Sequence, residues 1–280
     1  KREFDLARRM QKSLLPKRRR DGFPLLGMNL PAHEISGDFY DYFDLADGRI
    51  GFVIGDVSGK GLDAALLMVR AASLLRWVGK EGTPPSEWLA RVNEELCQTS
   101  LEGRFVCALV GHCDRNGEQV EIAAAGFPPA LRYKDGEFTE YLSGGAPLGI
   151  LPGMSFEASR IDLRGASLYC FSDGLTDVRD AQRQTIGAEG VRALIQRHAG
   201  ASAEPRLRGM FTELKHLRLV DDTTLLLVER MQVQGPEVLL KRRFPAQAEQ
   251  MRDIRTRLRS ALDDAGVESA LRDQLVLVVD

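Results

Sequence analysis

The chain has 280 residues, of which 44% are hydrophobic and 28% are charged, and its net charge is −2. This ordinary globular composition excludes an intrinsically disordered chain, a collagen and a coiled-coil rod. A chain of this length forms one large domain or two smaller ones, and either can bury enough apolar surface to fold without disulfides.

The charges are unevenly distributed along the chain. Residues 1–20 carry nine basic and two acidic side chains, and residues 231–280 carry eight of each, so the acidic excess lies in 21–230. An acidic middle segment argues against a nucleic-acid-binding surface there and suits a site that holds metal cations with carboxylates. The basic run 17–20 is interpreted as a solvated linker end, with contact to acidic lipid or nucleic acid as the alternative.

No apolar run is long enough to span a membrane, and the charged N-terminus lacks the apolar core of a signal peptide. The chain does not begin with Met and ends within the apolar pattern LVLVVD, so we expect a fragment of a longer protein. The four cysteines show neither a CxxC pair nor metal-ligand spacing; they are Cys97, Cys107, Cys113 and Cys170. We expect reduced thiols in a cytoplasmic protein.

The hydrophobic pattern predicts many strands and two pairs of helices. In chain order, strands are expected at 25–30, 39–45, 49–55, 105–113, 119–125, 130–133, 156–163, 167–171 and 223–228. Helices are expected at 3–15, 62–78, 87–98, 191–198 and 206–217. Strands in meander order indicate an α+β fold with largely antiparallel sheets rather than alternating βαβ units. A break at 232–236 predicts a domain boundary at 231.

Two predicted helices carry more specific expectations. The helix at 62–78 is apolar on most of its faces, so we expect it to be buried, with Leu66 on the buried face. Its position directly after a candidate site suggests that it could transmit an upstream signal. The helix at 87–98 follows two prolines, and Ser86 is its expected N-cap.

The first predicted hairpin carries two carboxylates. If the hairpin is centred on Asp47, Asp38 and Asp56 lie opposite one another on the same face. Two opposed carboxylates repel unless a cation lies between them. The pairing therefore predicts a cation site at the open end of the hairpin.

Two further acidic pairs stand at strand ends. Asp173 and Asp177 follow the strand 167–171, and Asp221 and Asp222 precede the strand 223–228. Carboxylates without His or Cys suit hard cations such as Mg²⁺ or Mn²⁺, and two such ions can activate water and hold a phosphoryl group. Each pair alone could be a turn, a helix cap or a solvated loop. Their joint position at strand ends favours the metal site.

Six motifs together identify a family resemblance. They are, in chain order, SGDFYD (36–41), GDVSGKG (55–61), AGFPPAL (125–131), APLGI (146–150), SDGLTD (172–177) and DDTTLLLV (221–228). The set resembles the metal-dependent Ser/Thr protein phosphatases, the PPM family. Within it, the set is most similar to the bacterial branch that includes the sporulation stage II phosphatase and the sigma-B regulatory phosphatases. The resemblance covers about residues 22–230.

The resemblance implies two stacked antiparallel β-sheets flanked by helices, with a dinuclear Mn²⁺ or Mg²⁺ centre at one end. It implies that Asp38, Asp56, Asp173 and Asp221 are the catalytic metal ligands. Asp56 would bridge the two ions, and the carbonyl of Val57 would bind the second.

The resemblance assigns less direct roles to three more aspartates. Asp222 would support Asp221, although which of the two is the ligand stays open. Asp177 lies where relatives can hold a third metal, and Asp41 would contact metal-bound water.

Three positions depart from the family pattern. Ser36 replaces a Gly, and Phe127 stands where relatives often have His. Val57 and Ser58 stand where eukaryotic-type relatives have a Gly-His pair, so no His acid is available and water would protonate the leaving group. Lys60 could meet a phosphate, with a capping or surface role as the alternative.

The flanking segments carry resemblances of their own. The basic helix within 1–20 resembles the linker between such phosphatases and an upstream sensory or receiver domain. The segment 231–280 resembles the start of an anti-sigma-factor kinase domain of the GHKL ATPase type, truncated before its nucleotide site. A helical extension of the phosphatase domain, 21–230, is the alternative.

The resemblance implies a phosphatase that acts on a phosphorylated anti-sigma-factor antagonist, a STAS protein, in a bacterial partner-switching pathway. No nucleic-acid partner and no membrane span are expected, and a homodimer stays open. One alternative is a two-metal nucleotidyl cyclase, because SGDFYD superficially resembles a diguanylate cyclase motif, although a cyclase needs a βαββαβ order. The other is a non-catalytic binding module with the same fold.

Overall fold

The computed structural model describes residues 15–16, 23–32, 36–99, 101–142, 144–230, 256, 259–260 and 262. The chain divides into two compact units, Lys1–Met231 and Gln232–Asp280. The basic run 17–20 lies outside the described residues, as do nearly all of the helix predicted at 3–15 and most of the segment 231–280. Their assignments stay predictions.

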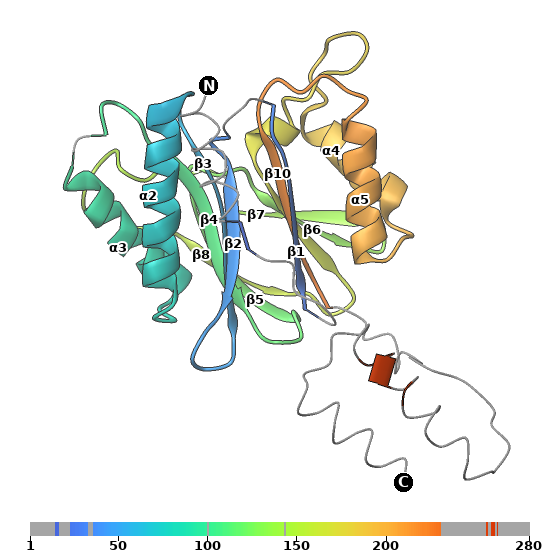
Figure 1. Ribbon diagram of the computed structural model, residues 1–280, viewed down its shortest axis with the longest axis horizontal. Coiled ribbons are helices and arrows are strands. Elements are labelled where there is room, and N and C mark those ends of the chain that lie inside the picture. The colour runs from blue at the N-terminus through green and yellow to red at the C-terminus, as the bar shows by residue number, and fades with distance from the viewer. Residues whose placement is uncertain are drawn as a thin grey trace, which may run out of the picture. The chain divides into compact units, whose positions relative to one another are not determined.

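Ten described strands form two five-stranded sheets in which every neighbouring pair is antiparallel (Figure 1). One sheet has the order β1-β10-β9-β6-β7, and the other has the order β2-β3-β4-β5-β8. The strands are β1 (Leu25–Leu30), β2 (Phe39–Asp44), β3 (Ile50–Val57), β4 (Val106–Cys113), β5 (Gln119–Ala125), β6 (Ala130–Lys134), β7 (Glu137–Tyr141), β8 (Ala158–Asp162), β9 (Ser167–Phe171) and β10 (Thr223–Glu229). The predicted α+β fold with two antiparallel sheets is confirmed.

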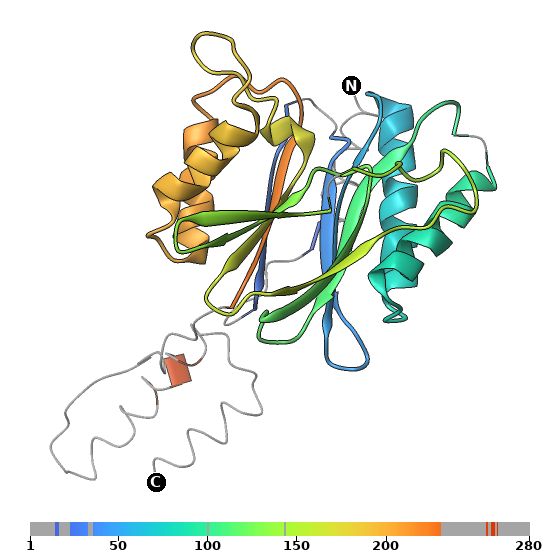
Figure 2. The same ribbon diagram turned by 180° about the vertical axis from the view of Figure 1, so that it is seen from behind.

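Helices cover the outer face of each sheet (Figures 1 and 2). The sheet that contains β2 and β3 packs against α2 (Leu62–Gly79) and α3 (Pro85–Cys97), and the sheet that contains β9 and β10 packs against α4 (Gly187–His198) and α5 (Ala203–Leu214). A short 3₁₀ helix, η1 (Asp173–Leu175), follows β9. The first unit therefore has four layers, with the two sheets stacked in the middle.

Alternation along the strands builds the core. On β3, Phe52 and Ile54 pack between the two sheets, whereas Val53 and Val57 face α2 and α3. Successive side chains of a strand point to opposite faces, so one apolar strand serves two buried layers at once. The same alternation decides which way each aspartate on these strands points.

Most predicted elements are present, but three details were wrong. The strand β7 was missed because its sequence, EFTEY, has only half-buried apolar residues at a sheet edge. Ser86 is not the N-cap of α3, because the helix starts at Pro85, two residues earlier than predicted, and Pro84 is the N-cap. The helix α2 is not buried on all sides, since Leu66 is 62% exposed.

The described residues also bear on the expectations for membrane spans and for cysteines. No described helix is long and apolar enough to cross a membrane. All four cysteines are free thiols, and Cys113 and Cys170 are buried.

Candidate functional site

The β2–β3 hairpin brings Asp38 and Asp56 together as predicted. Phe39 pairs with Gly55 in the observed register, so the next positions outward are Asp38 and Asp56. Asp56 lies two positions from Ile54 and Asp38 two positions from Tyr40, and both of these neighbours pack between the sheets. Their carboxylates therefore point into the end of the space between the two sheets.

The other sheet supplies the second group of carboxylates. Asp173 begins η1, with Ser172 between it and the end of β9, and Asp221 and Asp222 directly precede β10. These two strands pair antiparallel, so the end of one lies beside the start of the other. Gly174 allows the close approach, because a Cβ there would lie 1.9 Å from the carbonyl oxygen of Asp222.

Asp38 is held by two hydroxyl groups from the opposite sheet. Its side chain is buried, and its Oδ2 accepts hydrogen bonds from Ser172 Oγ at 2.7 Å and Thr224 Oγ1 at 2.6 Å. The Thr224 hydroxyl in turn accepts a hydrogen bond from Asn29 Nδ2 at 2.7 Å. The carboxylate thus has a single orientation, set by residues more than a hundred positions away in sequence.

The electrostatics of the carboxylate pair favour a bound cation. Burial, followed by repulsion from Asp56, raises the pKa of Asp38 well above its usual range. Burial, followed by the charge of Asp173, raises the pKa of Asp56 to about 7, although a hydrogen bond with Asp38 acts in the opposite direction. A divalent cation would relieve the repulsion that keeps protons on these groups.

The remaining aspartates differ in how they are held. Desolvation, then repulsion from Asp177 and Asp221, raises the pKa of Asp173. Asp221 is half-exposed, and its Oδ2 lies 3.5 Å from Lys60 Nζ. Asp222 is buried, and its two oxygens accept backbone hydrogen bonds from Ala32 at 2.7 Å and Gly37 at 3.0 Å.

Gly37 marks a second close approach within the site. A Cβ at this position would lie 2.8 Å from Asp56 Oδ1 and 3.0 Å from the Val57 carbonyl oxygen. These two oxygens therefore face the same small space, and only a residue without a side chain fits beside them. That Asp56 and the Val57 carbonyl bind metal stays a prediction.

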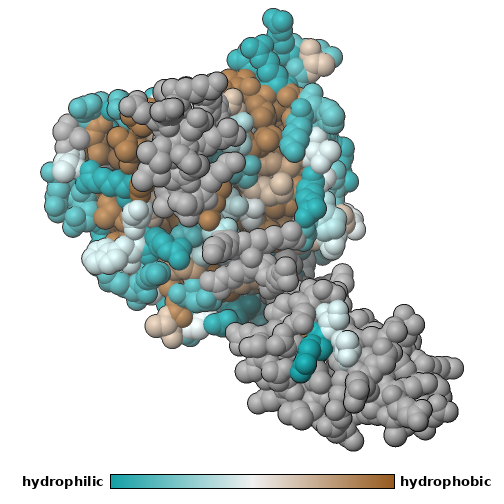
Figure 3. All heavy atoms as spheres, in the orientation of Figure 1, coloured by the Kyte–Doolittle hydropathy of each residue, from teal (hydrophilic) through white to brown (hydrophobic). Residues whose placement is uncertain are grey.

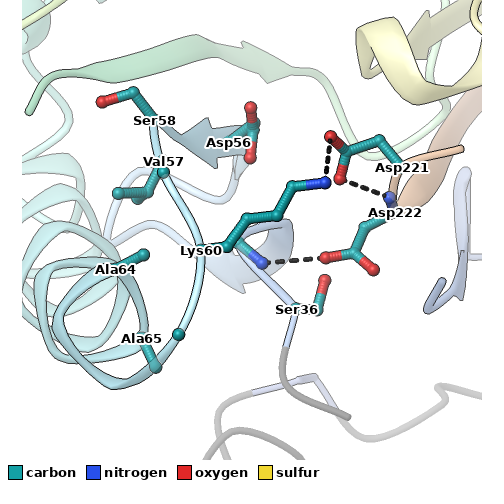
Figure 4. A pocket seen from close by; sticks show the side chains of 12 residues that line it. Ser36, Asp56, Val57, Ser58, Lys60, Ala64, Ala65, Asp221 and Asp222 are labelled. Atoms are coloured by element: carbon teal, nitrogen blue, oxygen red, sulfur yellow. Dashed lines mark hydrogen bonds and ion pairs between the residues drawn. The ribbon is translucent and has the colours of Figure 1, made fainter. Parts of the chain in front are cut away.

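Of the predicted site residues, Asp56, Val57, Asp221 and Asp222 line one pocket (Figure 4). Asp38, Asp173 and Asp177 are not among the residues that line it. Its walls are the segment Ser36–Gly37, the connection from β3 to α2, and the pair Asp221–Asp222. The donors are carboxylate and carbonyl oxygens, which are the ligands that Mg²⁺ and Mn²⁺ prefer. Among the residues that the structure describes, no three acidic, His or Cys side chains converge as a ready-made metal site. The residue set fits hard cations in its chemistry, and the Lys60–Asp221 ion pair spans the pocket.

Not every acidic residue of the motifs belongs to this pocket. Asp41 lies three positions from Asp38, so its side chain points to the opposite face of β2, where it pairs with Arg76 of α2. The interpretation of Asp41 as a contact to metal-bound water finds no support in this orientation of its side chain.

Two positions that depart from the family pattern have structural partners. The hydroxyl of Ser58 accepts a hydrogen bond from the backbone N–H of Phe105 at 2.8 Å, and Phe127 is buried between the sheets.

Four residues of the site escaped the sequence argument: Gly37, Ser172, Gly174 and Thr224. Each lies inside a motif, directly beside or two positions from an aspartate, but the side chains themselves carry no signal for their partners. The hydroxyls act on an aspartate of the other sheet, and the glycines act by being small. Only the packing of the two sheets reveals these roles.

Comparisons with known proteins agree with the geometry. The family model described as stage II sporulation protein E (SpoIIE) matches residues 46–231. The phosphoserine phosphatase RsbU of Bacillus subtilis is 27% identical over 238 residues, which are 82% of this chain and 70% of RsbU. The phosphoserine phosphatase RsbP of the same organism is 29% identical over 185 residues, which are 63% of this chain but only 46% of RsbP.

Solved structures share the fold. The SiaA-PP2C domain of Pseudomonas aeruginosa has a TM-score of 0.72 at 21% identity, covering 82% of this chain and 96% of that domain. The RsbU and RsbW domains of Rv1364c from Mycobacterium tuberculosis have a TM-score of 0.66 at 24% identity, covering 91% of this chain and 75% of that one. RsbX, solved in complex with magnesium, has a TM-score of 0.56 at 15% identity, covering 75% of this chain and 96% of RsbX. With two thirds of its length matched by the family model, the chain belongs to the SpoIIE family of PPM-type phosphatase domains.

Proposed function

We propose that this chain is a metal-dependent protein serine/threonine phosphatase whose substrate is a phosphorylated STAS-domain anti-sigma-factor antagonist in a bacterial partner-switching pathway. The observation that carries the proposal is that the two sheets place carboxylates at the same end of the sandwich, Asp56 from one sheet and Asp221 and Asp222 from the other. Asp38 is buried there, and burial, followed by the charge of Asp173, raises the pKa of Asp56 to about 7. Two relatives, RsbU and RsbP, are phosphoserine phosphatases.

Each aspartate of the site has a proposed role in metal binding. Asp38, Asp56, Asp173 and Asp221 would hold two Mn²⁺ or Mg²⁺ ions together with the carbonyl of Val57, and Asp177 would hold a third. Bound ions would supply an activated water and stabilise charge on the phosphoryl group. Since both oxygens of Asp222 already accept backbone hydrogen bonds, we assign Asp221 as the ligand and Asp222 as its support.

The cysteine beside the proposed site does not favour a covalent phosphoenzyme. Cys107 pairs with Asp56 across β3 and β4, which makes it the cysteine beside the proposed site. Burial, followed by the charges of Asp56 and Asp173, raises the pKa of the Cys107 thiol to about 12. A thiol that stays protonated at neutral pH is a poor nucleophile, so direct attack by water is the favoured route.

The flanks support the partner-switching assignment. We propose that 1–20 is a linker from an upstream sensory or receiver domain and that 231–280 starts an anti-sigma-factor kinase-like GHKL domain. The unit boundary after Met231 and the likeness to a structure with RsbU and RsbW domains are in line with this division. The cyclase alternative finds no favouring observation, because every strand pairing within the described sheets is antiparallel.

The test is dephosphorylation of a phosphoserine STAS protein by the whole chain, with Mn²⁺, with EDTA, and for the Asp56→Asn variant. Turnover that requires metal and is lost in Asp56→Asn supports the proposal. A folded protein that binds Mn²⁺ but shows no turnover at any metal concentration would favour the non-catalytic binding module instead.

A further inference from the structure

Lys60 is the feature of the pocket that the metal ligands leave unexplained. Of the twelve residues described around the pocket, it is the single basic one, whereas Asp56, Asp221 and Asp222 are acidic. A lysine ammonium group among carboxylates can neutralise their charge, or it can bind an anionic ligand, or it can do the first without ligand and the second with ligand bound.

The backbone directs Lys60 into the pocket. It stands between Gly59 and Gly61, whose φ angles of +99° and +88° favour glycine. With these two residues, the connection from β3 to α2 turns beside the pocket. Figure 4 shows the Lys60 side chain extended toward Asp221, where Nζ lies 3.5 Å from Oδ2.

The ion pair between Lys60 and Asp221 can break at low cost, so that Lys60 can bind another anion. The side chains of Lys60 and Asp221 are 61% and 47% exposed, and an ion pair this accessible to water adds little stability. The lysine stem is flexible and its ammonium is a compact point charge, so it can move to another anion within reach. Metal binding by Asp221 would release Lys60 from this pair.

A phosphorylated substrate supplies such an anion. A phosphoserine carries between one and two negative charges at neutral pH and has to approach a wall of aspartates. Cations bound by those aspartates would neutralise their negative charge, but phosphoryl oxygens that do not contact a metal still need a hydrogen-bond donor. A lysine beside the pocket meets that need as a point charge.

A second basic residue nearby, Arg104, forms its ion pairs outside the pocket. Arg104 lies against the same connection, with its Nε 3.7 Å from where a Cβ on Gly59 would be. Its guanidinium pairs with Asp63 at 3.0 Å and with Glu102 at 3.4 Å, both exposed. Arg104 is not among the residues that line the pocket. It therefore serves as a matched control for a loss of positive charge close to the site.

We propose that Lys60 binds the phosphoryl group of the phosphoprotein substrate and rests on Asp221 while the substrate is absent. The inference rests on the proposed phosphatase function and adds a substrate-binding residue to it. It concerns binding of phosphate as such, so it can be tested apart from turnover.

The first experiment measures binding of inorganic phosphate to the Mn²⁺-loaded chain by calorimetry. Lys60→Gln should raise the phosphate Kd about tenfold or more, the order expected for losing one charge-assisted contact. Lys60→Arg should restore the Kd to within a few-fold of wild type, and Arg104→Gln should leave it unchanged. The Mn²⁺ Kd of Lys60→Gln should be unchanged or lower, because Asp221 loses a competing cation.

An unchanged phosphate Kd in Lys60→Gln would overturn the inference, as would a wild-type chain that binds no phosphate at millimolar concentration. Circular dichroism would establish that each variant is folded. Kinetics on a phosphoserine STAS protein separates the two proposals. A raised KM in Lys60→Gln supports both, and an unchanged KM with full turnover rejects only the role of Lys60. Phosphate binding that depends on Lys60 without any turnover rejects only the phosphatase function.

Discussion

The hydroxyl of Thr224 offers the sharpest test of how the site is held. Thr224 is fully buried and donates to Asp38 Oδ2 at 2.6 Å, while it accepts from Asn29 at 2.7 Å. The substitution Thr224→Val keeps the shape of the side chain and removes both interactions. It therefore removes the hydrogen bond that links β10 to the carboxylate on the other sheet, together with the contact to Asn29.

The expected loss follows from the charge on Asp38. A hydrogen bond to a charged group contributes about 1.5–3 kcal/mol, which corresponds to a ten- to hundredfold change in an equilibrium constant. Since the Thr224 hydroxyl lowers the pKa of Asp38, its removal favours the protonated carboxyl, and a metal must then displace a more tightly held proton. We expect Thr224→Val to weaken Mn²⁺ binding about ten- to hundredfold, as measured by calorimetry at constant pH.

Thr223→Val is the matched control. Thr223 is the neighbouring buried threonine, and its hydroxyl makes only a long contact of 3.4 Å to the Asp221 carbonyl. Thermal unfolding of both variants in EDTA would measure any general loss of stability. Equal Mn²⁺ affinities for Thr224→Val, Thr223→Val and wild type would refute the reasoning that Asp38 is a metal ligand oriented by Thr224.

Three further outcomes are expected. Because burial and the charge of Asp173 raise the pKa of Asp56 to about 7, the metal-free protein should lose stability as the pH rises from about 4 through 7, and Asp56→Asn should flatten this dependence in denaturant titrations in EDTA. Gly37→Ala should lower Mn²⁺ affinity at least about tenfold, because its Cβ would lie 2.8 Å from Asp56 Oδ1, whereas Gly200→Ala, with open space around it, should not. Asp41→Asn should reduce stability by about 1–3 kcal/mol through its pair with Arg76 and leave Mn²⁺ affinity unchanged; an affinity loss like that of Gly37→Ala would place Asp41 in the site after all.

Local sequence patterns were enough to predict the β2–β3 hairpin, which carries Asp38 and Asp56. The turn at Asp47 and the alternation on either side determine the pairing of β2 with β3, and the observed register, Phe39 with Gly55, agrees with it. The exposed stripe of α2 was not recoverable in this way. Leu66 and Trp77 are apolar but 62% and 64% exposed, and apolar composition does not say which face of a helix has a neighbour.

The sequence by itself determined the fold class, the order of the elements and the motifs that hold the proposed metal ligands, because period, turn chemistry and motif spacing are local properties. The tertiary structure alone decided which groups surround Asp38. Ser172 and Thr224 reach it from the opposite sheet, at separations of 134 and 186 residues. Lys60 likewise reaches Asp221 only because the two sheets bring the start of α2 beside the start of β10. Contacts of this kind depend on how two sheets stack, and the stacking follows from the apolar core that the whole chain buries.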